Sequence, residues 1–189
     1  DKYLSQAPNF KEICTKILTT STNLWLIDAP TRAGKTYAFT HDFAPILQEQ
    51  HPQKIVLFVN PLRVTTDQTS QSTQGFGDGT TFCNSILTWD KALSFLRTNK
   101  DRLHDVVLII DEIHDLIKAA NYKANVISQM YTYFNKCFKV IGLSGTPFGV
   151  LEQFGFSSIK ATSSTPAAHN TNVILCDPKN TSSELVNLL

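Results

Sequence analysis

The chain has 189 residues, which is enough for one domain with a sizeable core and argues against two full domains. Hydrophobic residues make up 42% of it and charged residues 17%, a balance typical of a soluble globular protein and not of a disordered segment. The formal net charge is only +1, so the overall charge does not indicate a nucleic-acid partner, and any such binding has to come from local residues.

The first predicted element is a helix within residues 1–23. Its apolar residues recur at helical spacing, which predicts one face packed against a sheet. We interpret this segment as a packing helix without a direct role in chemistry. The apolar positions are Phe10, Ile13, Ile17 and Leu18.

A short apolar run, residues 24–27, leads into a turn that ends in Gly34-Lys35-Thr36. The spacing is that of the phosphate-binding loop G-x-x-x-x-G-K-[ST], with Ala29 at the first glycine position. A helix that begins near Gly34 would point its free N–H groups at a phosphate, with Lys35 near the β- and γ-phosphates and the Thr36 hydroxyl on Mg²⁺. The alternative is a strand-turn-helix corner with a chance Gly-Lys-Thr. The candidate nucleotide-binding residues are Ala29, Pro30, Thr31, Ala33, Gly34, Lys35 and Thr36.

The segment after the loop alternates between helical and strand patterns. A helix continues until His51-Pro52, and the apolar run 55–59 predicts a central parallel strand. A turn and a polar helix follow from Asn60, then a loop over 69–81 and a short strand over 82–86. The next helix is predicted to run from Leu87 to Leu96, with Thr88 or Asp90 as its cap.

The apolar run 106–110 ends abruptly in two carboxylates, Asp111 and Glu112. Buried strands do not normally tolerate charge, so the pair belongs at the exit of the strand. There Asp111 could hold the Mg²⁺ that Thr36 also contacts, and Glu112 could orient and deprotonate a water that attacks a γ-phosphate. The alternative is that both acids merely cap the following helix.

The remaining pattern predicts a helix over 116–134, interrupted near Asn121, and a strand over 138–143 that ends at Ser144. Beyond Pro147 we expect a short helix over 148–154, strands over 158–161 and 173–176, and the start of a helix over 182–189. Apolar strands that alternate with helices and end in polar residues predict an α/β domain, with a doubly wound, mostly parallel sheet flanked by helices.

The four cysteines lack the close spacing of a zinc site or of a disulfide framework. We interpret them as reduced, mostly buried thiols. No apolar run is long enough to predict a membrane span, so we expect no membrane partner and a cytoplasmic, nucleoid or nuclear location. The first residue is not Met, and we expect a piece of a longer protein. The cysteines are Cys14, Cys83, Cys137 and Cys176.

Five segments, in this order along the chain, resemble the motifs of superfamily 2 helicases of the DExH kind. Together they cover about 24–147. They are the Ala29 to Thr36 loop, Pro61-Leu62-Arg63 with the downstream Gln68, Thr88-Trp89-Asp90, Asp111-Glu112-Ile113-His114 and Ser144-Gly145-Thr146.

The resemblance implies a RecA-like P-loop domain, the first of the two in a helicase motor. Residues 1–176 would form this domain, and 177–189 would begin the linker to the second. Lys35, Asp111, Glu112 and His114 would be the catalytic residues, with ATP and Mg²⁺ as cofactors. In the family, the histidine and the segment matching Ser144, Gly145 and Thr146 link nucleotide state to domain movement. His114 could instead be a hydrogen-bonded residue at a helix start.

The resemblance also implies a single-stranded or duplex nucleic acid as partner, with DNA favoured over RNA. Pro61, Arg63, Gln68 and Thr88 would lie along it, with Arg63 and Thr88 on the sugar-phosphate backbone. Arg63 could instead be a solvated surface residue, and for Trp89 we prefer core packing over stacking on a base.

We expect an ATP-hydrolysing helicase or translocase that needs the second domain for full activity. The alternatives are a double-strand translocase, remodelling or restriction motor without unwinding, a catalytically incomplete module that binds nucleic acid or protein, and a P-loop ATPase acting on other substrates.

Overall fold

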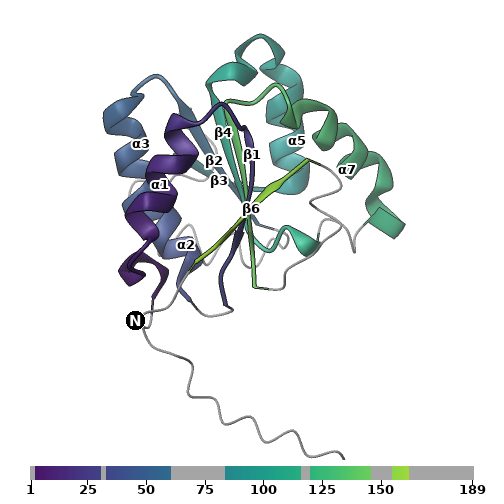
Figure 1. Cartoon of the computed structure of the whole chain (residues 1–189). Helices are drawn as coiled ribbons and strands as arrows, with labels where there is room; N and C mark the ends of the chain where they lie inside the picture. Colours follow the sequence, from purple (N-terminus) through teal and green to yellow (C-terminus); the bar gives the residue numbers. More distant parts are fainter. Residues whose placement is uncertain (1–2, 31–32, 61–83, 116–119, 146–154, 162–189) are drawn as a thin grey trace, which may run out of the picture.

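The computed structural model describes residues 3–30, 33–60, 84–115, 120–145 and 155–161. These residues contain a six-stranded sheet in which every pairing is parallel (Figure 1). The strands lie in the order β3-β2-β4-β5-β1-β6. The predicted α/β class with a parallel sheet is therefore confirmed. The strands are β1 (Leu24–Asp28), β2 (Ile55–Asn60), β3 (Asn84–Thr88), β4 (Val106–Ile110), β5 (Lys139–Ser144) and β6 (Ser157–Lys160).

Helices cover both faces of the sheet (Figure 1). One face carries α1 (Phe10–Thr19) and a helical segment made of α2 (Lys35–Tyr37), the π-helical turn η2 (Ala38–Phe43) and α3 (Ala44–Gln50). The other carries α5 (Trp89–Thr98) and α7 (Ala120–Phe134). Two short 3₁₀ helices are η1 (Leu4–Gln6) and η3 (Lys100–Asp105). Within the described residues no helix is both long and apolar enough to cross a membrane.

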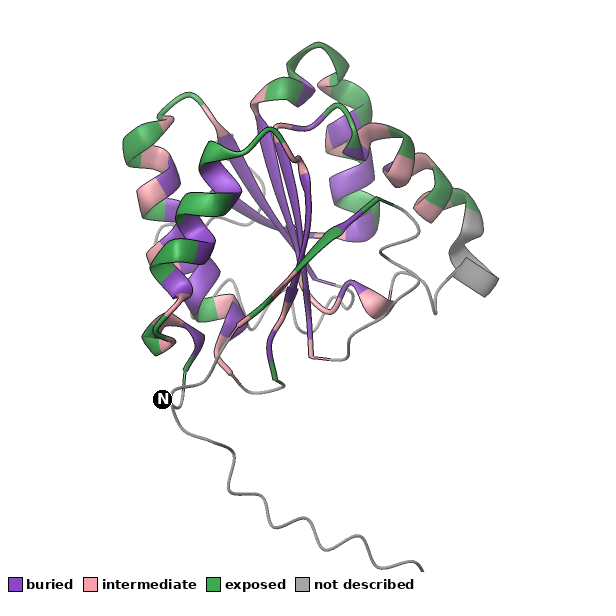
Figure 2. Cartoon of the chain, in the orientation of Figure 1, coloured by how far each residue is buried: buried purple, intermediate pink, exposed green. Residues whose placement is uncertain are grey.

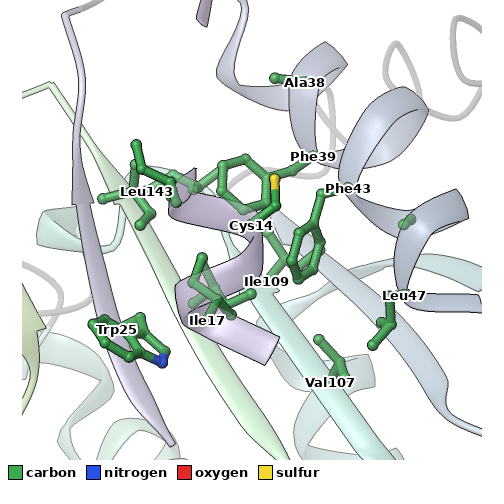
Figure 3. Packing of buried hydrophobic residues seen from close by; sticks show 14 of the residues in the cluster. Cys14, Ile17, Trp25, Ala38, Phe39, Phe43, Leu47, Val107, Ile109 and Leu143 are labelled. Atoms are coloured by element: carbon green, nitrogen blue, oxygen red, sulfur yellow. The ribbon is translucent and has the colours of Figure 1, made fainter. Parts of the chain in front are cut away.

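The central strands are continuous apolar runs because both of their faces are buried. Every residue of β2 and of β4 is buried, whereas β6, at the edge of the sheet, is largely exposed (Figure 2). Successive residues of β4 enter opposite cores, with Val107 and Ile109 on the α1 side. There Phe39 and Phe43 pack beside Ile17 (Figure 3). The predicted packing helix within 1–23 is thus confirmed.

Two predicted boundaries are wrong. The strand predicted over 82–86 extends to Thr88, and its helix begins at Trp89 and not at Leu87. The cause is the pairing of β3 with β2, which continues to the pair Asn60 and Thr88 and keeps the chain extended. Asn121 itself lies within α7, whereas residues 116–119 just before it, where the predicted interruption could also fall, lie outside the described residues. A single Asn costs a helix less than about 1 kcal/mol, which buried packing along the same helix outweighs.

Other predicted elements lie outside the described residues. They are those over 61–81, 148–154, 173–176 and 182–189, together with the boundary at 176. Among the cysteines, Cys14 and Cys137 are buried free thiols, and burial raises the pKa of each to about 12. Cys83 and Cys176 are outside the described residues.

Lys139 links the start of β5 to the segment before β1 at the amino edge of the sheet. Its side chain is buried, and Nζ donates hydrogen bonds to the backbone oxygens of Thr20 and Thr22, each at 2.6 Å. Replacing Lys139 with Met should leave both carbonyls without this donor and lower the free energy of unfolding by about 1–3 kcal/mol in urea denaturation. The control Lys136→Met changes an exposed lysine nearby. Equal stability of the two variants would contradict this role.

Candidate nucleotide-binding site

The phosphate-type loop lies at the carboxyl edge of the sheet. Strand β1 leads into it, and Ala29 follows, fully buried, with its N–H donating to the Ser144 oxygen at 3.0 Å. A small side chain therefore fits at the first glycine position. Gly34 has a φ of 67°, a left-handed conformation that favours glycine. Pro30 and Ala33 are also described, whereas Thr31 and Arg32 lie outside the described residues.

The helical segment after the loop begins at Lys35 and continues to Gln50. Among the described residues, no side chain forms a capping hydrogen bond at its start at Gly34. The first N–H groups of a helix have no partner within the helix, and together with the helix dipole they favour a bound anion. The helix start at Lys35 can therefore accept an anion.

Lys35 points back into the loop. The residue is only 6% exposed, and Nζ donates to the backbone oxygens of Ala29 at 3.3 Å and Pro30 at 3.2 Å. It also lies 3.6 Å from Glu112 Oε1. A buried cation beside two carbonyls and one carboxylate can transfer these contacts to phosphate oxygens. Lys35 thus connects the loop to the carboxylates at the end of β4.

Thr36 and Asp111 form a pair of oxygen donors. The Thr36 hydroxyl donates to Asp111 Oδ2 at 3.4 Å. Burial, followed by the negative charge of Glu112, raises the pKa of the Asp111 carboxyl, and Lys35 partly opposes this. Mg²⁺ typically binds one or two carboxylates, hydroxyls, waters and substrate phosphates. This donor pair fits such an ion, whose charge would favour the ionised carboxylate.

The raised pKa of Asp111 predicts how stability depends on pH without divalent cations. A carboxyl whose pKa is higher when folded binds its proton more tightly in the folded state, so stability falls as the pH rises above the ordinary value of 3.8. We expect urea denaturation in EDTA to show this fall, and Asp111→Asn to reduce it. Parallel pH curves for the two proteins would contradict the assignment.

Glu112 is held in an unusual backbone conformation. Its φ is 43°, and it is the one non-glycine residue with a positive φ among the described residues. Its Oε1 faces Lys35, while Oε2 is buried and accepts no hydrogen bond from the described part of the chain. A buried carboxylate oxygen without a donor is suited to accept a hydrogen bond from a water molecule.

His114 connects the carboxylates to the end of β5. Its Nδ1 lies 3.0 Å from the Ser144 hydroxyl and 3.3 Å from Glu112 Oε2, and its Nε2 lies 3.3 Å from Asp115. Nδ1 and the Ser144 hydroxyl have the geometry of a hydrogen bond. Glu112 Oε2 lies close to Nδ1 but does not form a hydrogen bond with it. His114 therefore lies at the start of a helical turn, and its imidazole joins the ends of β4 and β5.

The family model for DEAD/DEAH box helicases matches residues 8–154. The chain belongs to the DEAD/DEAH box helicase family. The match contains the loop, the Asp111 to His114 segment and Ser144. No curated protein matches the chain.

Solved structures share the fold of this helicase chain at low identity. S. cerevisiae dbp5 bound to gle1 and IP6 has 11% identity and a TM-score of 0.57, over 82% of this chain and 46% of that one. A DEAD box protein from Methanococcus jannaschii has 16% identity and a TM-score of 0.57, over 80% and 48%. The Sulfolobus solfataricus SWI2/SNF2 ATPase core in complex with dsDNA has 16% identity and a TM-score of 0.52, over 78% of this chain and 34% of that one. The helicase chain therefore spans less than half of these structures.

The predicted nucleic-acid residues of the helicase chain are only partly described. Thr88 ends β3 at the carboxyl edge of the sheet and is half-buried. Trp89 is 4% exposed and packs in the core with α5, which confirms the preferred interpretation and argues against stacking on a base. Gly145 is described next to Ser144. Pro61, Arg63, Gln68 and Thr146 lie outside the described residues.

Two features of this helicase site escaped sequence reasoning. The N-terminal segment packs on the loop, with Leu4 N–H donating to the Ala33 oxygen at 2.6 Å and Tyr3 lying against Gly34. The other is close packing between Ile113 and Gly142. A glycine inside the apolar run 138–143 was a usable signal for the second feature, because such a glycine often marks a close approach.

Proposed function

We propose that the chain is the first motor domain of a DExH-type helicase or translocase, which hydrolyses ATP to ADP and phosphate and moves on nucleic acid. The observation that carries the proposal is the convergence of Lys35, Thr36, Asp111 and Glu112 at one edge of the sheet. This set combines a phosphate-binding cation, two oxygen donors for a metal and a carboxylate that can accept a proton. Family membership supports the same activity.

Each side chain has a distinct part in the proposed hydrolysis. The loop N–H groups and Lys35 bind the phosphate oxygens and neutralise charge as it develops. Thr36 and Asp111 would hold the Mg²⁺, which would supply neutralisation of the phosphate charge. Glu112 Oε2 orients a water molecule and accepts its proton, while the water oxygen bonds to the γ-phosphorus and the bond to ADP breaks.

The proposed link from hydrolysis to movement runs through His114. Its contact with Ser144 connects the end of β4 to the end of β5, and Gly145 and Thr146 follow directly. A change at Glu112 on nucleotide binding or release would therefore move this hydrogen bond. The domain would comprise residues 1–176, and 177–189 would begin the linker to a second RecA-like domain.

The proposed track is a nucleic acid, with DNA favoured over RNA. It would lie at the carboxyl edge along Pro61, Arg63, Gln68 and Thr88, with Arg63 and Thr88 on the sugar-phosphate backbone. A translocase that does not unwind strands is the second candidate, because one protein of similar fold is a SWI2/SNF2 ATPase core in complex with dsDNA.

ATP hydrolysis by the protein that contains this chain and its second motor domain tests the proposal. The assay compares no polymer, single-stranded DNA, single-stranded RNA and duplexes of each. Stimulation by one polymer supports the motor and identifies its track, and strand-separation assays then distinguish unwinding from translocation. Hydrolysis that no nucleic acid alters would contradict the motor. No hydrolysis at all would favour a binding module.

A further inference from the structure

Glu112 needs an external restraint, because the left-handed region is unfavourable for a residue with a Cβ. Its neighbours are attached to two different strands. Asp111 N–H donates to the Val59 oxygen in β2 at 2.9 Å, and Ile113 N–H donates to the Leu143 oxygen in β5 at 3.0 Å. Glu112 therefore spans the gap between two fixed points, and its φ depends on where Ile113 lies.

The position of Ile113 depends in turn on Gly142. Ile113 is fully buried against β5. A Cβ on Gly142 would lie 2.6 Å from Ile113 Cδ1, 2.9 Å from its Cγ2 and 3.2 Å from its Cβ. Gly142 is absent from the residues with positive φ, so the glycine is required for space and not for its own backbone conformation. Two of these contacts involve atoms close to the Ile113 backbone, which cannot move without moving Glu112.

We propose that Ile113 and Gly142 are positioning residues that hold Glu112 in its left-handed conformation. With Ile113 seated on Gly142, the Glu112 carboxylate faces Lys35, and His114 meets Ser144. A side chain at position 142 would push Ile113 outward and move both the carboxylate and the imidazole. The inference rests on the proposed ATP hydrolysis, in which Glu112 accepts the proton from water.

The test uses Gly142→Ala, Ile113→Val and the double variant in the protein with both motor domains. Gly142→Ala should lower kcat about 10- to 100-fold, the cost of displacing a catalytic group by about 1 Å, with little change in the dissociation constant of ATP. Ile113→Val removes the Cδ1 methyl that would clash most closely, so the double variant should recover part of the lost kcat, while the contacts with Cγ2 and Cβ remain.

The matched control is Val140→Ile. Val140 lies two residues before Gly142 in β5 and in the same core as Ile113. The substitution Val140→Ile therefore adds a methyl group on the same face of the strand, farther from Glu112. It should leave kcat near that of the unaltered protein. An equal loss of kcat in Val140→Ile, or an unchanged kcat in Gly142→Ala, would overturn the proposal.

The NMR chemical shifts of the backbone amides of Glu112 and His114 provide a measurement that does not depend on turnover. We expect them to move in Gly142→Ala, to return toward their original positions in the double variant and to stay in place in Val140→Ile. Unmoved shifts in Gly142→Ala would overturn the positioning role. If the unaltered protein does not hydrolyse ATP but these shifts behave as expected, the proposed function fails and the positioning role stands.

Discussion

Replacing Glu112 with Gln is expected to lower the ATP turnover number about 10²- to 10⁴-fold while ATP still binds, because general base catalysis contributes about that much. The substitution keeps the shape of the side chain but removes its capacity to accept a proton. It also removes a negative charge that raises the pKa of Asp111, so the fold should not suffer. The two measurements are the ATP turnover of the full-length protein and its affinity for ATP.

The control for this prediction is Glu49→Gln. Glu49 is exposed on α3, so the same chemical change there should leave turnover unaltered. A Glu112→Gln protein that hydrolyses ATP at the original rate would contradict the role of Glu112 as the base. Loss of binding together with turnover would instead indicate that Glu112 mainly holds Lys35 in place.

Replacing Lys35 with Met should remove about half or more of the stabilisation that MgATP gives the chain. A charged hydrogen bond contributes about 1.5–3 kcal/mol, so ATP affinity should fall roughly 10- to 100-fold. At an ATP concentration 100 times the original dissociation constant, the unaltered chain should gain about 2.7 kcal/mol and the variant much less. Thermal unfolding with and without MgATP measures both gains.

The nucleotide-free Lys35→Met chain is a test in itself. The variant loses the bonds to Ala29 and Pro30, and it loses the cation that partly opposes the raised pKa of Asp111. Its stability should therefore keep falling to a higher pH than that of the unaltered chain, so that the total fall is larger. The control is Lys54→Met. Lys54 forms an ion pair with Asp105 and lies just before the start of β2, at the edge of the sheet opposite the loop, so this substitution should leave the effect of MgATP intact. An undiminished MgATP shift in Lys35→Met would contradict the phosphate role.

Local patterns predicted most of the fold and several of the residues that meet at the candidate site. Continuous apolar runs identified the buried parallel strands because helices cover both faces, and Gly34-Lys35-Thr36 identified the loop through its spacing. The pairing of Lys35 with Glu112 and of His114 with Ser144 depends on the parallel register of the strands, which no local pattern contains.

The wrong strand boundary and the points that the sequence left open have the same origin. Leu87 reads as the start of a helix, but its pairing with Val59 keeps it in a strand. The sequence allows Trp89 either to stack on a base or to enter the core, and only the direction in which the helix leaves β3 decides between them. The contact between Ile113 and Gly142 joins residues 29 positions apart along the chain, so it too requires the fold.

Strand β5 places a residue that stabilises the fold and a residue of the candidate site at its opposite ends. Lys139 lies at its first position and Ser144 at its last, five steps of about 3.3 Å and so about 16 Å apart. Mutational effects at sites separated by more than about 10 Å usually add. Substitutions at the amino end can thus raise or lower the free energy of unfolding of this helicase domain without altering the hydrogen bond between Ser144 and His114. That end of the sheet is where selection can compensate for destabilising changes near the carboxylates.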